Sequence, residues 1–193
     1  MNPNQFCFCP LCGTALGDIV EEGVTLKHCH GCKKFTHYDN PKGVAVAVIP
    51  KDGGLVLIKR TVAPRAGKYA LPAGFINKGE GPREACVRET KEETGLVVEI
   101  VRALAELPVG PANQFLCFYE VKVVGGELVA GSDAGEVAVY QLDALPSDIA
   151  FPLHDQVIKD WIAAQPQATA KAQAPAQPPV HAEAEPQVET KSV

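Results

Sequence analysis

A cluster of carboxylates in the middle of the chain has the spacing to bind a divalent cation. Glu89 precedes Glu92 and Glu93 by three and four residues, a spacing that makes them neighbours on one helix face. Carboxylates this close repel one another unless a cation lies among them, and their hard oxygens suit Mg²⁺ or Mn²⁺. Arg88, four residues before Glu92, can orient one carboxylate. Because Mg²⁺ usually completes its shell with water and substrate phosphates, the cluster predicts a phosphorylated ligand.

These carboxylates require a helix to position them. Pro82 suits a first helical position and Gly95 suits the position just past a helix end, so a helix is predicted over 82–94. On that helix the four charged residues fall within an arc of about 140°. Taken alone, the glutamates are better explained as an ordinary solvated helix face, and the surrounding pattern is what favours a metal site. The opposite side of the helix carries Cys86, Val87, Thr90 and Thr94 and is predicted to pack.

The sequence around the helix resembles the Nudix motif, G-x₅-E-x₇-R-E-U-x-E-E-x-G-U, where U is a large apolar residue. Thr90 departs from the pattern, which is predicted to weaken the packing of the helix rather than the metal site. The resemblance implies an α/β/α sandwich with a mixed sheet that hydrolyses a diphosphate linkage. The motif positions are Gly74, Glu80, Arg88, Glu89, Glu92, Glu93, Gly95 and Leu96.

The resemblance also implies roles for individual residues. Glu89, Glu92 and Glu93 become ligands of Mg²⁺ or Mn²⁺, and the Ala73 carbonyl becomes a further ligand, although residues 71–74 also read as a plain strand end with a turn. A carboxylate near the metal would accept a proton from the attacking water. Glu89 is the first candidate for this base, and Glu136, which precedes a predicted strand, is the second. An ordinary exposed residue is an equally good reading of Glu136.

Three residues outside the motif are candidates for substrate contacts. Arg60, at the end of a predicted strand, can reach a phosphate; Tyr69 can stack on a base; and Phe115 can line the pocket. A structural role is the stronger alternative for each of them.

Two cysteine pairs near the N-terminus have the spacing of a zinc ribbon. Cys9 and Cys12 form one C-x₂-C motif, and Cys29 and Cys32 form a second after sixteen intervening residues. Four thiolates close a tetrahedral shell, so this Zn²⁺ is predicted to stabilise the fold rather than to perform chemistry. A redox C-x₂-C motif is the weaker alternative. Cys7 can compete as a ligand.

The remaining pattern predicts an α/β domain between two other segments. Apolar runs at 44–49 and 55–58, separated by Asp52-Gly53-Gly54, predict a β-hairpin. Further strands are expected at 96–107, 115–124 and 136–142, and a closing amphipathic helix at 153–164. The tail is rich in Ala, Pro and Gln and is predicted to be disordered. The predicted organisation is therefore a zinc ribbon at 1–38, a hydrolase domain at 39–164 and a tail at 165–193.

Charge and composition narrow the choice of partner. The net charge is -5 and no basic run stands out, so the predicted partner is a small nucleotide rather than nucleic acid. No apolar stretch suits a membrane span or an export signal, which predicts a cytoplasmic protein. Nudix enzymes of this kind are often homodimers, and a homodimer is expected here.

The ribbon and the 38–42 entry resemble the branch of the family that includes FAD and ADP-ribose pyrophosphatases, with NADH pyrophosphatases more distant. The S-Q-P-W-P-F-P motif of the NADH branch is missing from 107–114. The leading hypothesis is therefore hydrolysis of FAD, ADP-ribose or a similar dinucleotide to monophosphates. The alternatives are an NADH or NAD pyrophosphatase, a nucleotide-sensing domain without catalysis, and a ribbon that serves mainly as a docking module.

Overall fold

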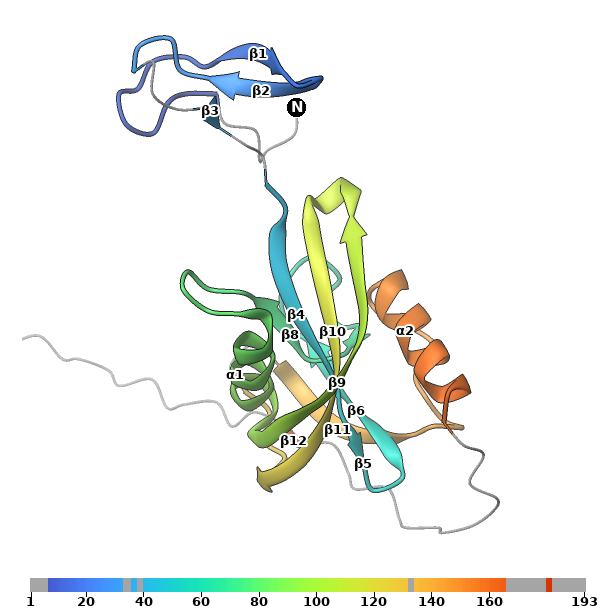
Figure 1. Ribbon diagram of the computed structural model, residues 1–193. Coiled ribbons are helices and arrows are strands. Elements are labelled where there is room, and N and C mark those ends of the chain that lie inside the picture. The colour runs from blue at the N-terminus through green and yellow to red at the C-terminus, as the bar shows by residue number, and fades with distance from the viewer. Residues whose placement is uncertain (1–6, 33–35, 38–39, 132–133, 166–179, 182–193) are drawn as a thin grey trace, which may run out of the picture. The chain divides into compact units, whose positions relative to one another are not determined.

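The structure, a computed structural model, describes residues 7–32, 36–37, 40–131, 134–165 and 180–181. Its contacts divide the chain into two compact units, one of residues 1–41 with 111–113 and the other of residues 42–110 with 114–193. The smaller unit contains an antiparallel sheet in the order β1-β2-β3 (Figure 1). Its strands are β1 (Gly17–Glu21), β2 (Val24–His28) and β3 (Thr36–His37).

The smaller unit has very little apolar core of its own. Among its described residues, the buried hydrophobic side chains are those of Cys9, Leu26 and Cys29. A segment of this size with so few buried apolar groups needs another source of stability, such as a bound metal.

The larger unit contains two sheets. The first has the strand order β8-β4-β10-β9, in which β4 is parallel to β10 and the other neighbours are antiparallel. The sheet is therefore mixed, as predicted, and β4 lies inside it, where five consecutive residues from Ala45 to Ile49 are buried. Its strands are β4 (Lys42–Val48), β8 (Ala73–Phe75), β9 (Leu96–Val109) and β10 (Gln114–Gly126), with the 3₁₀ turn η1 (Gly110–Ala112) between the last two.

The second sheet has the order β12-β11-β6-β5, with β7 also paired to β6. The hairpin predicted between 44–49 and 55–58 forms only near its turn, where the Val56 N–H donates to the Ile49 carbonyl at 3.0 Å, because most of the first run is β4 and belongs to the first sheet. The partner of β6 at the Asp52-Gly53 turn is instead the short β5, and both turn residues have positive φ, as a two-residue hairpin turn requires. The strands are β5 (Pro50–Lys51), β6 (Gly54–Arg60), β7 (Tyr69–Ala70), β11 (Ala134–Gln141) and β12 (Val180–His181).

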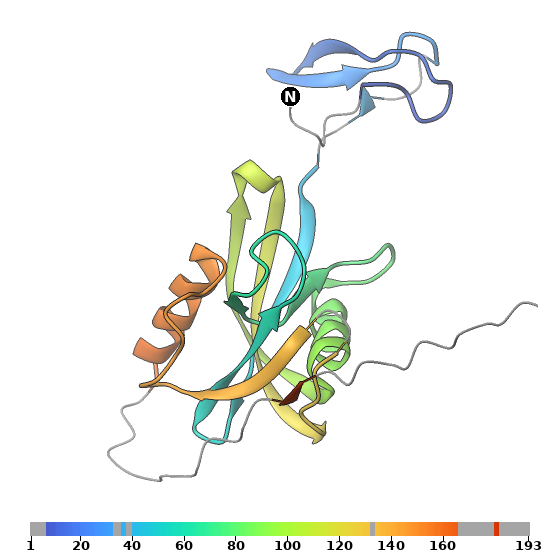
Figure 2. The same ribbon diagram turned by 180° about the vertical axis from the view of Figure 1, so that it is seen from behind.

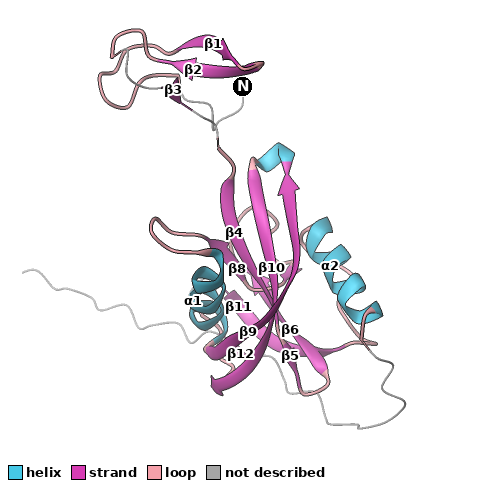
Figure 3. Ribbon diagram, viewed as in Figure 1, coloured by secondary structure: helices cyan, strands magenta, loops and turns pink. Residues whose placement is uncertain are grey.

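Two helices cover opposite sides of the strands, as Figures 1 and 2 show, which confirms the predicted sandwich. Helix α1 (Pro82–Thr94) contributes Ala85 and Cys86 to one core cluster, and helix α2 (Pro152–Ala163) contributes Val157, Ile158 and Trp161 to the other. The alternation of helices and strands along the chain is visible in Figure 3.

Helix α1 has the predicted bounds and the predicted caps. Pro82 stands at its start, and Gly95 follows its end in the left-handed conformation, donating its N–H to Lys91. Thr90, the departure from the motif, is fully buried, and its hydroxyl donates to the Cys86 carbonyl at 2.7 Å. The helix thus satisfies this polar group internally.

Most of the predicted tail lies outside the described residues. The described residues of the tail are Gln165, just after α2, and the two residues of β12, Val180 and His181, which pair with Val137 and Glu136 of β11. Among the helices within the described ranges, none has the length and apolar character needed to cross a bilayer.

Candidate functional site

Arg88 joins the carboxylates of helix α1 to the segment that precedes it. Its Nη1 donates to Glu89 Oε1 at 2.6 Å and to Glu92 Oε2 at 3.0 Å. Its Nε and Nη2 donate to the two oxygens of Glu80, both at 2.8 Å, and Nη2 also donates to the Phe75 carbonyl at 3.0 Å. Only the planar guanidinium fork can satisfy this arrangement, because an ammonium group has no two parallel donors.

Glu80 is a partner of Arg88 that the sequence reasoning placed in the motif without giving it a role. Its bonds from the Arg88 side chain and from the Asn77 backbone N–H lower the pKa of Glu80 to about 2, so it stays ionised. The same carboxylates raise the pKa of Arg88. A local signal existed, since Glu80 lies eight residues before Arg88 at the only other fixed acidic position of the motif.

Strand β8 lies directly against the carboxylate face of α1. The Ala73 N–H donates to Glu93 Oε2 at 2.9 Å. At the next residue, Gly74, a Cβ atom would overlap the carboxylate of Glu89, so that carboxylate occupies the space that a side chain would take. The structure therefore brings Ala73, Glu89 and Glu93 together, through the Ala73 N–H rather than its carbonyl, and their role as metal ligands stays a prediction.

The end of α1 is held by the loop after β10. The Val129 N–H donates to the Thr94 carbonyl at 2.9 Å, and the Gly131 N–H donates to the Glu93 carbonyl at 3.1 Å. A Cβ atom at Gly131 would overlap the Glu92 carbonyl, so this close approach requires glycine. The helix turn that carries Glu92 and Glu93 is thus fixed at its end.

Glu136 lies on β11, and its side-chain partners are residues of β6 and β11. Its Oε1 accepts a hydrogen bond from the Tyr140 hydroxyl at 2.9 Å, and Lys59 Nζ is 3.9 Å from its Oε2. Tyr140 packs against the core cluster on the α2 side, so Glu136 shares a strand face that is directed away from the α1 core. Burial, followed by the bond to Glu136, raises the pKa of Tyr140, which keeps this hydroxyl a donor. As a general base, Glu136 stays a prediction.

The three predicted substrate contacts have structural partners. Arg60 donates to the carbonyls of Val62 and Pro64, and its guanidinium lies 5.1 Å from the Phe151 ring centroid. These contacts hold the loop after β6 and favour the structural reading of Arg60.

Tyr69 and Phe115 are likewise engaged in packing. The Tyr69 ring meets Tyr140 edge to face at 5.3 Å and has Lys59 Nζ 5.5 Å from its centroid. Phe115 is half-buried against the core cluster on the α1 side. Their roles in substrate binding stay predictions.

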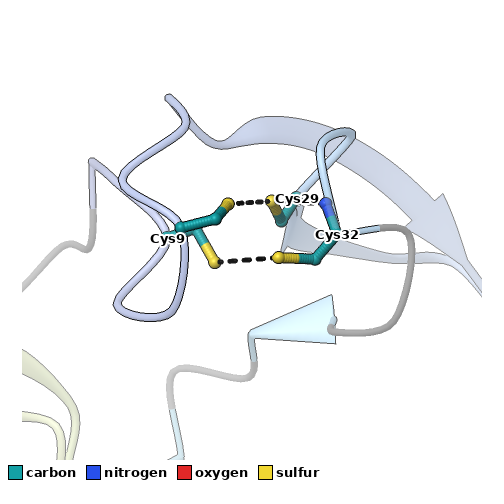
Figure 4. Close-up of side chains that lie close together, drawn as sticks. Cys9, Cys29 and Cys32 are labelled. Atoms are coloured by element: carbon teal, nitrogen blue, oxygen red, sulfur yellow. Dashed lines mark hydrogen bonds between the residues drawn. The ribbon is translucent and has the colours of Figure 1, made fainter.

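The four predicted zinc ligands converge in the smaller unit. The sulfurs of Cys9, Cys12, Cys29 and Cys32 all lie within 4.8 Å of one another. The Cys9–Cys32 and Cys12–Cys29 sulfur pairs are 3.9 and 3.5 Å apart, and Figure 4 labels Cys9, Cys29 and Cys32 among the side chains that lie close together. Two ligands on a tetrahedral zinc with bonds of about 2.3 Å are separated by about 3.8 Å, so the spacing fits.

Other cysteines have separate places. Cys7 is exposed and is not a member of this group of four. Cys86 and Cys117 are buried in the core cluster on the α1 side, as predicted, and burial raises the pKa of Cys86 to about 12. In the group of four, hydrogen bonds with Thr14 lower the pKa of Cys12 to about 6, whereas the hydrogen bond between Cys12 and Cys32 raises the pKa of Cys32 to about 12.

Comparisons with known proteins agree with this geometry. An ADP-ribose pyrophosphatase of Methanocaldococcus jannaschii is 39% identical over 135 residues, which cover 67% of this chain and 78% of that protein. The NAD-capped RNA hydrolase NudC of Vibrio cholerae is 29% identical over 112 residues, and the match spans only 40% of its length. A solved Nudix hydrolase of Nitrosomonas europaea superposes with a TM-score of 0.75 at 28% identity, covering 83% of this chain and 95% of that one.

The family model described as "NUDIX domain" matches residues 39–163, a range that includes both sheets' long strands, both helices and the whole carboxylate cluster. The chain therefore belongs to the Nudix hydrolase family.

Proposed function

We propose that this chain hydrolyses ADP-ribose, FAD or a similar dinucleotide at its diphosphate linkage, in the presence of Mg²⁺ or Mn²⁺, to give two monophosphates. The observation that carries the proposal is the carboxylate face of α1, held in place by Arg88 and β8. The similarity to a relative named ADP-ribose pyrophosphatase supports the choice of substrate.

The carboxylate oxygens of these residues have the donor chemistry that a hard divalent cation prefers. Glu89, Glu92 and Glu93 offer carboxylate oxygens from one helix face, and β8 lies against two of them. Arg88 pairs with three carboxylates, those of Glu80, Glu89 and Glu92, so one positive charge faces three negative charges in this group. Magnesium or manganese held by these residues would offset the charge that develops on the diphosphate and lower the pKa of a bound water.

The proton of the attacking water needs an acceptor on the protein, and we propose Glu89 for this role. Its side chain is 16% exposed and lies between Arg88 and Gly74, so it remains accessible at a defined position. Glu136 is less well placed, because its bonds to Tyr140 and Lys59 belong to the strand face on the α2 side.

The proposal is tested by the release of nucleoside monophosphate from ADP-ribose, FAD, NADH and diadenosine polyphosphates. Each substrate is offered with Mg²⁺, with Mn²⁺ and with EDTA. We expect hydrolysis that depends on the cation, is abolished by EDTA and prefers ADP-ribose or FAD. Absence of turnover across the panel would instead favour a nucleotide-sensing domain, which direct binding of ADP-ribose would then reveal.

A second candidate is the hydrolysis of NADH or of NAD-capped RNA. Similarity to relatives named NAD-capped RNA hydrolase favours it, although the chain spans well under two thirds of their length. The predicted exclusion of nucleic acid therefore stays a prediction, as does the homodimer. Adding an NAD-capped oligonucleotide to the panel separates this candidate from the first one, because only the second candidate predicts that the cap is cleaved.

We further propose that the four clustered cysteines bind one structural Zn²⁺. The purified protein should contain about one zinc per chain. Cys29→Ser should lose most of this zinc and unfold the smaller unit, because metal binding supplies folding free energy to a unit with so small a core.

The matched control for zinc binding is Cys7→Ser, since Cys7 is exposed and outside the group of four. Metal analysis should give wild-type zinc for this variant. Equal zinc loss in the two variants would show that Cys7 is a ligand, and full zinc content in Cys29→Ser would contradict the site.

A further inference from the structure

A buried histidine of α2 contacts the backbone that leads to the carboxylate site. The side chain of His154 is almost fully buried, at 3% exposure, and its ring lies 5.6 Å from Phe118 and 5.1 Å from Phe151 between ring centroids. Its Nδ1 accepts a hydrogen bond from the Leu71 N–H at 3.3 Å. Burial, followed by repulsion from Arg60, lowers the pKa of His154 to about 3, so the ring is neutral at physiological pH and Nδ1 stays an acceptor.

Residues 71–74 transmit this contact to the carboxylate cluster. Leu71 is fully buried, so its N–H has no access to water and needs a protein acceptor. The Pro72 carbonyl accepts from the Ala47 N–H at 2.9 Å, and the Ala73 N–H donates to Glu93. Because this segment is short and each of its first three residues has a fixed partner, a shift at Leu71 is transmitted to the backbone at Ala73 and Gly74.

We propose that His154 is a positioning residue for the hydrolytic site, acting through Leu71 to hold β8 against Glu89 and Glu93. The inference rests on the proposed function, since it treats those glutamates as the cation site. Loss of the Nδ1 acceptor leaves the Leu71 N–H buried without a partner, and the segment must move to reach one. His154 contacts none of the proposed ligands directly, so its effect is indirect.

The test compares His154→Leu with His154→Asn. Leucine fills the core but offers no acceptor, whereas the Asn side-chain oxygen can occupy the position of Nδ1. In His154→Leu we expect faster hydrogen exchange of the Leu71 amide and a Mn²⁺ dissociation constant up to about 10-fold higher, the lower end of the range for loss of a group bonded directly to a metal ligand, because His154 acts one step further away. His154→Asn should restore both. Binding is measured by titrating the zinc-loaded protein with Mn²⁺, without substrate, and Glu93→Gln identifies the signal of this site.

Ile158→Ala is the control for general destabilisation, because Ile158 is buried in the same helix and carries no polar group. It should lower the melting temperature and leave Mn²⁺ affinity unchanged. Unchanged Mn²⁺ affinity and Leu71 protection in His154→Leu would overturn the inference.

One further variant keeps the test decisive. If His154→Leu does not fold, His154→Gln replaces it, because Gln reaches toward the Nε2 position and should fail to rescue where Asn succeeds. Equal behaviour of the Gln and Asn variants would overturn the inference. If the wild type binds Mn²⁺ at Glu93 but hydrolyses none of the panel substrates, the proposed function fails while the positioning role is still tested by the binding data.

Discussion

Glu93→Gln is expected to lower kcat by at least about 100-fold while the protein stays folded. Loss of an outer partner of a metal ligand typically costs 10 to 100-fold, and loss of a direct ligand should cost more. In the wild type, Glu93 Oε2 accepts a hydrogen bond from the Ala73 N–H. The fold should survive because the Gln side-chain oxygen can accept the same hydrogen bond. Steady-state kinetics across a Mg²⁺ titration, with a melting curve for each variant, measures both effects.

Glu99→Gln is the matched control for this charge removal. Glu99 lies on β9 and pairs with Lys122 at 2.7 Å, with both side chains 60% exposed, so its loss should be nearly neutral. Wild-type turnover in Glu93→Gln would remove Glu93 from the cation site. A similar loss in both variants would point to a general effect of net charge instead.

Gly74→Ala is expected to reduce activity by about 10 to 100-fold through a single added methyl group. The new Cβ would overlap the Glu89 carboxylate, which would have to leave its place between β8 and Arg88. Because the end of a flexible side chain moves more easily than the backbone, we expect the half-saturating Mg²⁺ concentration to rise and the melting temperature to change little.

Gly110→Ala controls for the general effect of replacing a glycine. No atom lies within 4 Å of a Cβ built at Gly110, and its backbone is outside the left-handed region. This variant should keep wild-type kinetics. If Gly74→Ala also keeps them, the position of Glu89 against β8 has no part in turnover.

Much of the fold could be predicted because its signals are local. Pro82 and Gly95 mark the ends of α1 directly, and the structure has the same bounds. The hairpin pairing could not be predicted, because the runs at 44–49 and 55–58 look alike as apolar segments. Which sheet each run joins depends on β10, whose residues lie far along the chain.

In the site, too, contacts within one helix could be predicted and contacts between separate elements could not. The spacing of the α1 residues predicted that Arg88 and Glu92 are neighbours, and they are bonded. The bonds from Arg88 to the Phe75 carbonyl and from Ala73 to Glu93 depend on how β8 packs on α1. The spacing of residues along one helix cannot predict that packing. The contact between His154 and Leu71 joins positions 83 residues apart, so it was beyond reach from sequence alone.

The parallel pairing of β4 with β10 has a consequence for how the enzyme is made. Strand β4 holds β8 on one edge and is itself paired with β10, whose residues leave the ribosome roughly 70 residues later. During synthesis, the apolar strand β4 therefore lacks its parallel neighbour until β10 has been made. A nascent chain that stops before Gln114 therefore carries the whole Nudix motif and every residue of the contacts between α1 and β8, but it lacks the strand that lies between β4 and β9 in the first sheet.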